Sequence, residues 1–380
     1  MGFSCGIIGL PNVGKSTIFN ALTSAKAAAA NFPFCTIEPN TGAVPVPDDR
    51  LGKLSAIAKS EKIVPTQVTF VDIAGLIKGA SKGEGLGNQF LGHIRSVDAV
   101  AHVVRAFSDP DVVHVDGRVD PVSDIETIDT ELMLSDLDAL SKRKERLEKA
   151  VKSQDKDAKI EYELISKIEA LLSDGKPARG FSLPAGDANE GVLTNIKAQL
   201  LTAKPTMFVA NVDEKDLKHT PNPDGLGNPA GGEHALDKIA AHAKKVGASV
   251  VVICGKIESE IAELDASERS VYLADLGLEQ SGLDRMAVAG YKLLDLLTFF
   301  TVGPKETHAW TVTKGATGPQ AAGKIHTDFE RGYIRAEVIS YADYVSLGGE
   351  ARAREAGKLR TEGKEYLMQD GDIVHFRFNV

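Results

Sequence analysis

The chain has 380 residues, a length that suggests two or three domains at roughly 100 to 200 residues per domain. Its composition, with 43% hydrophobic and 26% charged residues, is that of a globular protein and excludes a disordered or collagen-like chain. The net charge of −9 argues against a globally basic nucleic-acid coat but leaves room for a local basic patch. Three scattered cysteines fit a reducing compartment, and no apolar run is long enough to span a membrane, so we expect a cytoplasmic protein.

Short apolar runs in the first two thirds of the chain predict buried parallel strands at residues 3–9, 68–73, 99–104, 206–211 and 249–254. Helical patterns at residues 17–24 and 86–97 lie between the first three runs. Strand and helix therefore alternate along the chain. This alternation predicts an α/β domain with a mostly parallel sheet that is covered on both faces.

Residues 126–174 contain neither Gly nor Pro, and their apolar residues recur at helical spacing. The polar run at residues 153–158 interrupts this pattern and predicts an antiparallel helical hairpin, inserted between the third and fourth strands. Its first helix carries cations interleaved with acids, namely Lys142, Arg143, Lys144, Arg146, Lys149 and Lys152. They are either a solvated helix face or a contact surface for nucleic acid or another partner, and the sequence leaves both interpretations open.

Alternating strands at residues 298–303, 308–313, 333–340 and 372–378 predict a small β-rich domain at the end of the chain. We expect domain limits at 1–124 and 200–296 for the nucleotide-binding domain, 125–199 for the helical insertion and 297–380 for the β-rich domain. The Pro- and Gly-rich residues 222–232 are expected to form a surface loop.

Residues 9–16, GLPNVGKS, fit the pattern G-x-x-x-x-G-K-[ST] between a predicted strand and a predicted helix. In such a loop, backbone N–H groups surround a phosphate, Lys15 bridges the β- and γ-phosphates and the Ser16 hydroxyl binds Mg²⁺. We expect nucleotide contacts from Gly9, Asn12, Val13, Gly14, Lys15, Ser16 and Thr17.

The next core strand ends in the sequence Asp72-Ile-Ala-Gly75. Asp72 is placed to serve the water shell of Mg²⁺, and the Gly75 N–H to contact the γ-phosphate. Thr36, in the loop between the first helix and the second core strand, is predicted as the second hydroxyl ligand of the metal beside Ser16. The alternative for Thr36 is an ordinary loop threonine.

Together, four segments resemble the YchF subfamily, the Obg-like ATPases among the P-loop GTPase-related proteins: residues 9–17, residues 31–40 (NFPFCTIEPN), residues 72–95 and residues 211–214 (NVDE). The resemblance covers essentially the whole chain. It implies a Ras-like P-loop NTPase domain that is interrupted by a helical coiled coil and followed by a C-terminal, ubiquitin-like TGS domain.

The NVDE segment departs from the N-K-x-D sequence with which related GTPases read guanine. The longer side chain of Glu214 cannot hold its carboxylate where Asp accepts two hydrogen bonds from guanine, and Val212 replaces a lysine stem over the base. Adenine leaves no donor unpaired in such a site, and Asn211 can still pair with its N6/N7 edge, so we expect the guanine preference to vanish or reverse. The backbone of Gly255 is expected to contact the base from a second loop.

Catalysis also departs from the common pattern, because Leu76 stands where many relatives carry a water-orienting Gln. Intrinsic hydrolysis should therefore be slow. The resemblance points to His114 as an alternative catalytic group, with a packing histidine as the rival interpretation. Asn12 matches the P-loop Asn of potassium-stimulated relatives, although this residue alone does not establish a K⁺ site.

We therefore expect a Mg²⁺-dependent nucleotidase, used as a molecular switch, that binds ATP at least as well as GTP and hydrolyses it slowly. The resemblance implies a ribosome or ribosomal RNA as partner; we expect no DNA, no membrane and a monomer. The alternative is a nucleotide-gated protein-binding module in which hydrolysis is incidental.

Overall fold

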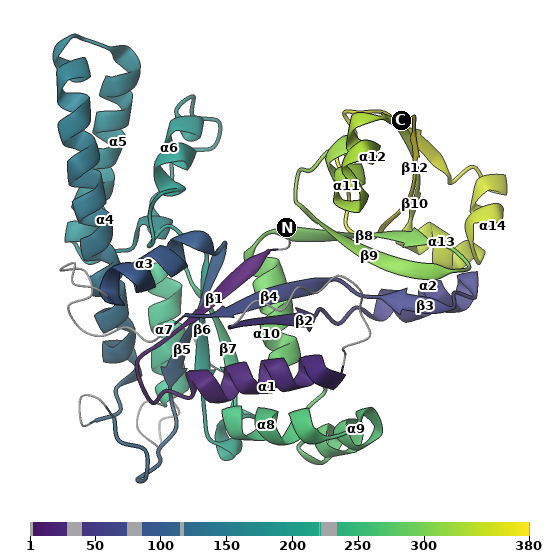
Figure 1. Ribbon diagram of the computed structural model, residues 1–380, viewed down its shortest axis with the longest axis horizontal. Coiled ribbons are helices and arrows are strands. Elements are labelled where there is room, and N and C mark those ends of the chain that lie inside the picture. The colour runs from purple at the N-terminus through teal and green to yellow at the C-terminus, as the bar shows by residue number, and fades with distance from the viewer. Residues whose placement is uncertain are drawn as a thin grey trace. The chain divides into compact units, whose positions relative to one another are not determined.

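The computed structural model describes residues 3–28, 40–73, 86–114, 118–219, 221 and 234–379. Contacts divide the chain into two compact units, Met1–Val44 with Thr69–Gly290 and Pro45–Val68 with Tyr291–Val380 (Figure 1). Among the described residues, no helix combines the length and apolar character needed to cross a membrane.

The first unit contains a six-stranded sheet in the order β2-β4-β1-β5-β6-β7. Its strands are β1 (Ser4–Ile8), β2 (Thr41–Pro45), β4 (Gln67–Asp72), β5 (Ala99–Arg105), β6 (Thr206–Asn211) and β7 (Ser249–Ile253). From β4 to β7 neighbouring strands run parallel, which confirms the predicted fold class. The edge strand β2 was not predicted, because its sequence TGAVP combines two residue types that are rare in strands.

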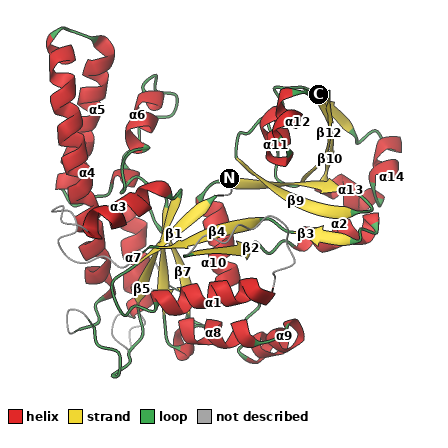
Figure 2. Ribbon diagram, viewed as in Figure 1, coloured by secondary structure: helices red, strands yellow, loops and turns green. Residues whose placement is uncertain are grey.

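Helices cover the sheet of the first unit (Figure 2). They are α1 (Lys15–Ala28), α3 (Leu86–Ser96), α7 (Ala235–Val246), α8 (Gly255–Glu263), α9 (Ala266–Asp275) and α10 (Gly282–Leu293), with the short 3₁₀ turn η3 (Glu214–Asp216). Helix α6 (Glu190–Lys197) and the 3₁₀ turn η2 (Ala178–Gly180) pack instead in one apolar cluster with the two helices of the hairpin. In α7, Leu236, Ile239 and Ala243 lie one helical turn apart and pack with Phe208 of β6 in one apolar cluster. This packing fixes the strand ends from which the site is built.

The predicted helical hairpin is present as α4 (Pro121–Lys152) and α5 (Lys156–Ser173). Asp120 caps the first helix ahead of Pro121, and Asp155 caps the second by accepting from the Ala158 N–H at 2.9 Å. The inner part of α4 packs on β5 and α7, and its outer part packs on α5. We call these two helices the arm.

The second unit contains a mixed sheet in the order β11-β10-β12-β8-β9-β3. Its strands are β3 (Lys62–Val64), β8 (Leu296–Val302), β9 (Glu306–Thr313), β10 (Tyr333–Ser340), β11 (Arg360–Glu362) and β12 (Asp372–Phe378), and its helices are α2 (Asp49–Ala58), α11 (Gly318–Ile325), α12 (Thr327–Arg331), α13 (Tyr341–Leu347) and α14 (Glu350–Glu355). The predicted C-terminal strands therefore form a β-rich unit, with β8 and β12 parallel at its centre.

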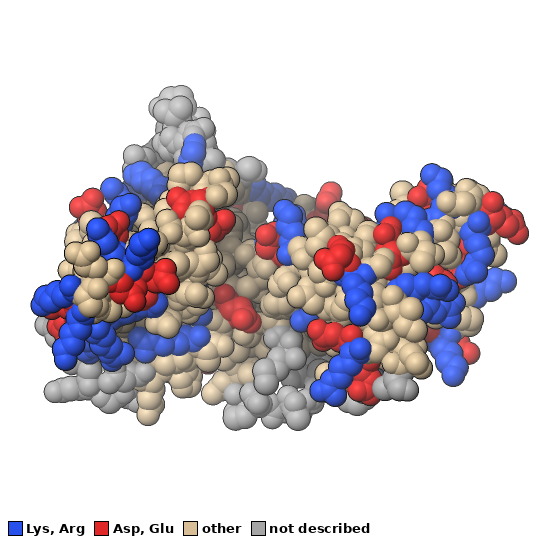
Figure 3. All heavy atoms as spheres, turned by 90° about the horizontal axis from the view of Figure 1, so that it is seen from above, with Lys and Arg blue, Asp and Glu red and all other residues tan. Residues whose placement is uncertain are grey.

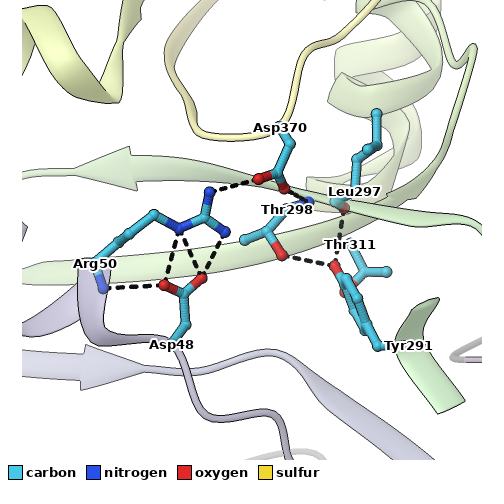
Figure 4. A network of polar contacts seen from close by, with 7 residues as sticks. All are labelled: Asp48, Arg50, Tyr291, Leu297, Thr298, Thr311 and Asp370. Carbon is cyan, nitrogen blue, oxygen red and sulfur yellow. Dashed lines mark hydrogen bonds and ion pairs between the residues drawn. The ribbon is translucent and has the colours of Figure 1, made fainter. Parts of the chain in front are cut away.

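Residues 45–68 join this second unit although they lie far from it in the sequence. Leu51 and Leu54 of α2 pack in one apolar cluster with Phe300 of β8. Arg50 binds Asp48 through Nη2 at 2.7 Å and Asp370 through Nη1 at 2.6 Å (Figure 4). An apolar face and a shared ion-pair network thus fix α2 on the C-terminal strands.

Candidate nucleotide-binding site

The loop between β1 and α1 approaches its neighbours so closely that two of its positions require glycine. A Cβ atom on Gly9 would lie 2.7 Å from the Val103 carbonyl oxygen. Gly14 has a φ of +91°, and a Cβ there would lie 2.1 Å from Nδ2 of Asn211. The glycines of the motif therefore allow the loop to fold against β5 and β6.

Charged and hydroxyl groups surround the first turn of α1. Lys15 begins the helix, and Ser16 and Thr17 follow on its exposed surface. No acidic residue lies in this turn, so its free N–H groups and the helix dipole can act on an anion. The Lys15 ammonium forms an ion pair with Asp72 at the end of β4. The structure thus brings Lys15 and Asp72 together, with Ser16 next to Lys15 on the helix.

Asn211 ends β6 and connects two loops, and it is only 5% exposed. Its Nδ2 donates to the Val13 carbonyl at 2.9 Å, and its Oδ1 accepts from the Gly255 N–H at 2.9 Å. Each end of the amide keeps one further hydrogen-bonding position for a base. Asn211 therefore ties the phosphate loop to the start of α8, a role that the sequence did not indicate.

Val212 and Glu214 have opposite surroundings. The Val212 side chain is 2% exposed and packs in the apolar cluster of β6 and α7, and its N–H donates to the Ile253 carbonyl at 2.8 Å. Glu214 is exposed at the start of η3. Of the two residues, Glu214 is the one whose side chain is free to move toward a ligand.

A cavity of about 1170 Å³ connects the phosphate loop to the base segment, a volume slightly above the usual range of about 300 to 1000 Å³ for ligand pockets. Its lining includes Gly14 and Thr17 at the phosphate loop and Asn211, Val212, Glu214 and Gly255 at the base segment. It also includes Phe107 and Lys218, which the sequence did not indicate, and Lys256, which follows Gly255 in the second predicted base-contacting loop. Phe107 was detectable in principle, because it follows β5 at the carboxyl end of a parallel strand, where ligands bind in such sheets.

His114 lies in a buried position, 8% exposed, with its Nε2 at 2.9 Å from Oδ2 of Asp124 on α4. In this conformation the ring packs against the base of the arm. Its predicted catalytic role stays a prediction, since it requires the ring to turn toward the phosphates.

The remaining predicted positions are distributed as follows. Asn12 has a φ of 63° and donates from Nδ2 to the Val113 carbonyl at 3.1 Å, an arrangement that leaves the K⁺ prediction as it was. Thr36, Gly75, Leu76 and the loop at 222–232 lie outside the described residues.

Ser16 and Asp72 supply oxygen donors, which is the donor type that Mg²⁺ prefers, so the described residues fit this ion.

A parallel sheet whose first strand leads through a glycine-containing phosphate loop into a helix, with an acidic residue at the end of the adjacent strand, defines the P-loop NTPase class. The family model described as a 50S ribosome-binding GTPase matches residues 4–160, and the model YchF-GTPase_C, described as a protein of unknown function, matches residues 296–379.

Relatives match over the full length of the chain. The ribosome-binding ATPase YchF of Pasteurella multocida is 55% identical and that of Bacillus subtilis 52%, each with 100% of both chains covered. The solved structure of the Schizosaccharomyces pombe YchF GTPase has a TM-score of 0.85 and 37% identity, covering 99% of this chain and 98% of that one. The chain belongs to the YchF family.

Proposed function

We propose that this protein is a Mg²⁺-dependent nucleotidase that binds ATP at least as well as GTP, hydrolyses it slowly and acts as a switch on the ribosome. The observation that carries the proposal is the single cavity that joins the phosphate loop to the NVDE segment. Its phosphate end is common to P-loop NTPases, and its base end lacks the Asp that selects guanine.

At the phosphate end, the ion pair of Lys15 with Asp72 holds the ammonium beside the first turn of α1. An incoming triphosphate offers Lys15 a stronger partner, because several oxygens share its negative charge. Lys15 then neutralises the phosphates, and the loop N–H groups bind them. Asp72 is released to accept from water near the phosphates.

A Mg²⁺ ion bound with the nucleotide would neutralise charge on the phosphate oxygens. Ser16, Asp72 and Thr36 are the residues that we propose to hold it, directly or through water. No group of three or more His, Cys, Asp or Glu able to hold a metal occurs in the part of the chain that the structure describes. This fits an ion that binds together with the nucleotide, since Mg²⁺ commonly uses substrate phosphates and few protein ligands.

At the base end, exposed Glu214 is the group that we propose to decide selectivity. Its carboxylate is one methylene further from the backbone than the Asp that binds guanine, so the guanine N–H donors lose their acceptor. Leaving a buried donor unpaired costs about 1 to 3 kcal/mol. The amide of Asn211 can form hydrogen bonds to either base with its remaining donor and acceptor positions.

Two observations support a ribosomal partner. Full-length relatives are named ribosome-binding ATPases, and the family model over the first part of the chain is described as a 50S ribosome-binding GTPase. Ribosomes also make the cytoplasm the proposed site of action. We propose that the partner raises the rate of hydrolysis, because Leu76 offers no polar group to orient water.

Equilibrium binding of ATP and GTP, with hydrolysis measured with and without purified ribosomes, tests the proposal. We expect similar or tighter binding of ATP and faster turnover on ribosomes. A tenfold or greater preference for GTP would refute the base argument. Nucleotide-dependent ribosome binding with unchanged turnover would favour the protein-binding module instead.

A further inference from the structure

Ion pairs within the arm occupy much of the basic face of α4. Arg143 Nε lies 2.5 Å from Glu161 of α5, and Lys144 Nζ lies 2.6 Å from Glu169. Two further ion pairs lie along α4 itself, between Lys142 and Asp138 and between Lys152 and Glu148. Figure 3 shows both signs of charge interspersed on the face that it presents. The surface of the arm is therefore not uniformly basic.

One part of this face differs, because it lines a groove of about 640 Å³ between α3 and α4. On α4 its lining positions follow each other at helical spacing, from Ser135 through Lys142 and Arg143 to Arg146, and α3 contributes Arg95. Four cations and the single carboxylate of Asp138 line the groove, so its formal charge is +3 in a chain of net charge −9.

Two of these cations are available to a ligand. Arg146 is exposed and has neither an ion pair nor a hydrogen bond to any residue that the structure describes. Arg95 has one long contact, from Nη2 to the Ser135 hydroxyl at 3.5 Å. Between them, Arg143 is held in place by Glu161 and by Gln199, which accepts from Nη1 at 3.1 Å. The groove therefore has a fixed cation in the middle and, from each helix, a guanidinium that makes no ion pair with any residue that the structure describes.

We infer that this groove binds the ribosomal RNA backbone, with one phosphate at Arg95 and another at Arg146. Guanidinium groups match phosphate oxygens in two-point hydrogen bonds, and Ser135 and Gln199 add neutral polar groups at the floor and rim. No aromatic side chain lines the groove among the described residues, so bases have no platform on which to stack. The contact is thus to the backbone and independent of base sequence.

The position of the groove also connects it to the nucleotide. Helix α3 is the next described element after Asp72, and residues 74–85 join the two. One RNA strand with phosphates at Arg95 of α3 and at Arg146 of α4 connects the two helices. If the nucleotide changes the position of α3, it changes RNA affinity by the same factor by which RNA changes nucleotide affinity.

The inference rests on the proposed ribosomal partner, and paired charge reversals test it. The groove variant carries Arg95→Glu with Arg146→Glu. Its matched control carries Lys149→Glu with Lys159→Glu, which changes the charge equally at two exposed arm positions outside the groove. Sedimentation with purified ribosomes should weaken at least about tenfold in the groove variant and much less in the control.

Salt dependence gives a second readout. Loss of two phosphate contacts should reduce the slope of log affinity against log salt by roughly 1.4 to 1.8. The milder pair Arg95→Gln with Arg146→Gln should lie between wild type and the reversed variant, and thermal unfolding shows whether each variant folds. Ribosome affinity is also measured with an ATP analogue and with ADP. The difference between the two nucleotides should be smaller in the groove variants than in the wild type. A difference of unchanged size would refute the link through α3.

The outcomes separate the two proposals. If the wild type does not sediment with ribosomes, the proposed partner fails whatever the groove does. If it sediments but the groove variant binds equally well, or the control loses as much, the groove inference fails alone. Retained binding of the groove variant to purified ribosomal RNA, with binding to whole ribosomes lost, would assign the groove to an acidic ribosomal protein and overturn the RNA inference.

Discussion

The phosphate end and the base end of the candidate site are built in opposite ways. At the phosphate end, Ser16 and Thr17 are exposed on the first turn of α1, and the ion pair of Lys15 is accessible to a ligand. At the base end, Asn211 and Val212 are buried and bonded to neighbouring backbone. Substitutions at the phosphate end should therefore weaken nucleotide binding without unfolding the protein. Substitutions in the base segment should also reduce stability, because this segment is part of the core.

The largest effect on stability is expected for Val212→Asp. Aspartate is too short to reach solvent from a site with 2% exposure, so the substitution buries a polar or charged group without a partner. We expect the free energy of unfolding to fall by at least about 3 kcal/mol. Denaturant unfolding measures this, with Val212→Ala as the control for lost volume. A small loss would mean that this end is not part of the core.

Asn211→Ala should have the next largest effect. It leaves the Val13 carbonyl and the Gly255 N–H without their side-chain partner, at about 1 to 3 kcal/mol for each group that stays buried and unpaired. Binding of both ATP and GTP should weaken as well, since the phosphate loop loses its support. If unfolding is unchanged while binding is lost, the amide serves the ligand alone.

Lys15→Ala should have the opposite effect, with a small loss of stability and a large loss of nucleotide affinity. The partly exposed pair with Asp72 contributes little to folding, so we expect less than about 1 kcal/mol of lost stability. Nucleotide affinity should fall on the order of a hundredfold, because a charge-assisted phosphate contact disappears. Lys159→Ala, on the exposed side of the arm, is the control for a lost charge. An unfolded Lys15 variant would give this residue a structural role.

The smallest change is expected for Glu214→Asp, which should leave stability unaltered because the side chain is exposed. The shorter carboxylate can reach the guanine N–H donors, so the ratio of GTP to ATP affinity should rise by roughly threefold to tenfold. This single change tests selectivity without disturbing the buried Val212. An unaltered ratio would show that Glu214 does not read the base.

The core strands and the arm could be predicted because their signals are local. Buried parallel strands are continuous apolar runs, as at residues 99–104, and the arm has a helical period without Gly or Pro. The phosphate loop could also be predicted, since its spacing and its place between strand and helix are both visible in the sequence.

What the sequence does not reveal depends on tertiary neighbours. NVDE identifies the base segment, but the burial of Val212 and the two backbone bonds of Asn211 follow from how β6 meets α7 and α8. In the same way, Arg143 and Lys144 look like part of a uniform basic face until α5 places Glu161 and Glu169 beside them. The sequence of residues 45–68 likewise gives no sign that helix α2 and strand β3 join the C-terminal sheet.

Because residues 45–68 pack on C-terminal strands, they are synthesised long before their partners. Leu51 and Leu54 of α2 share an apolar cluster with residues of β8 and β9, and β3 pairs with β9, so the second unit cannot close until its C-terminal strands exist. At about 5 to 20 residues per second, residues 69–290 take roughly 10 to 45 s to synthesise. During this time the apolar face of α2 has no native cover. The nascent chain therefore carries a helix whose apolar face stays uncovered until β8 and β9 are made.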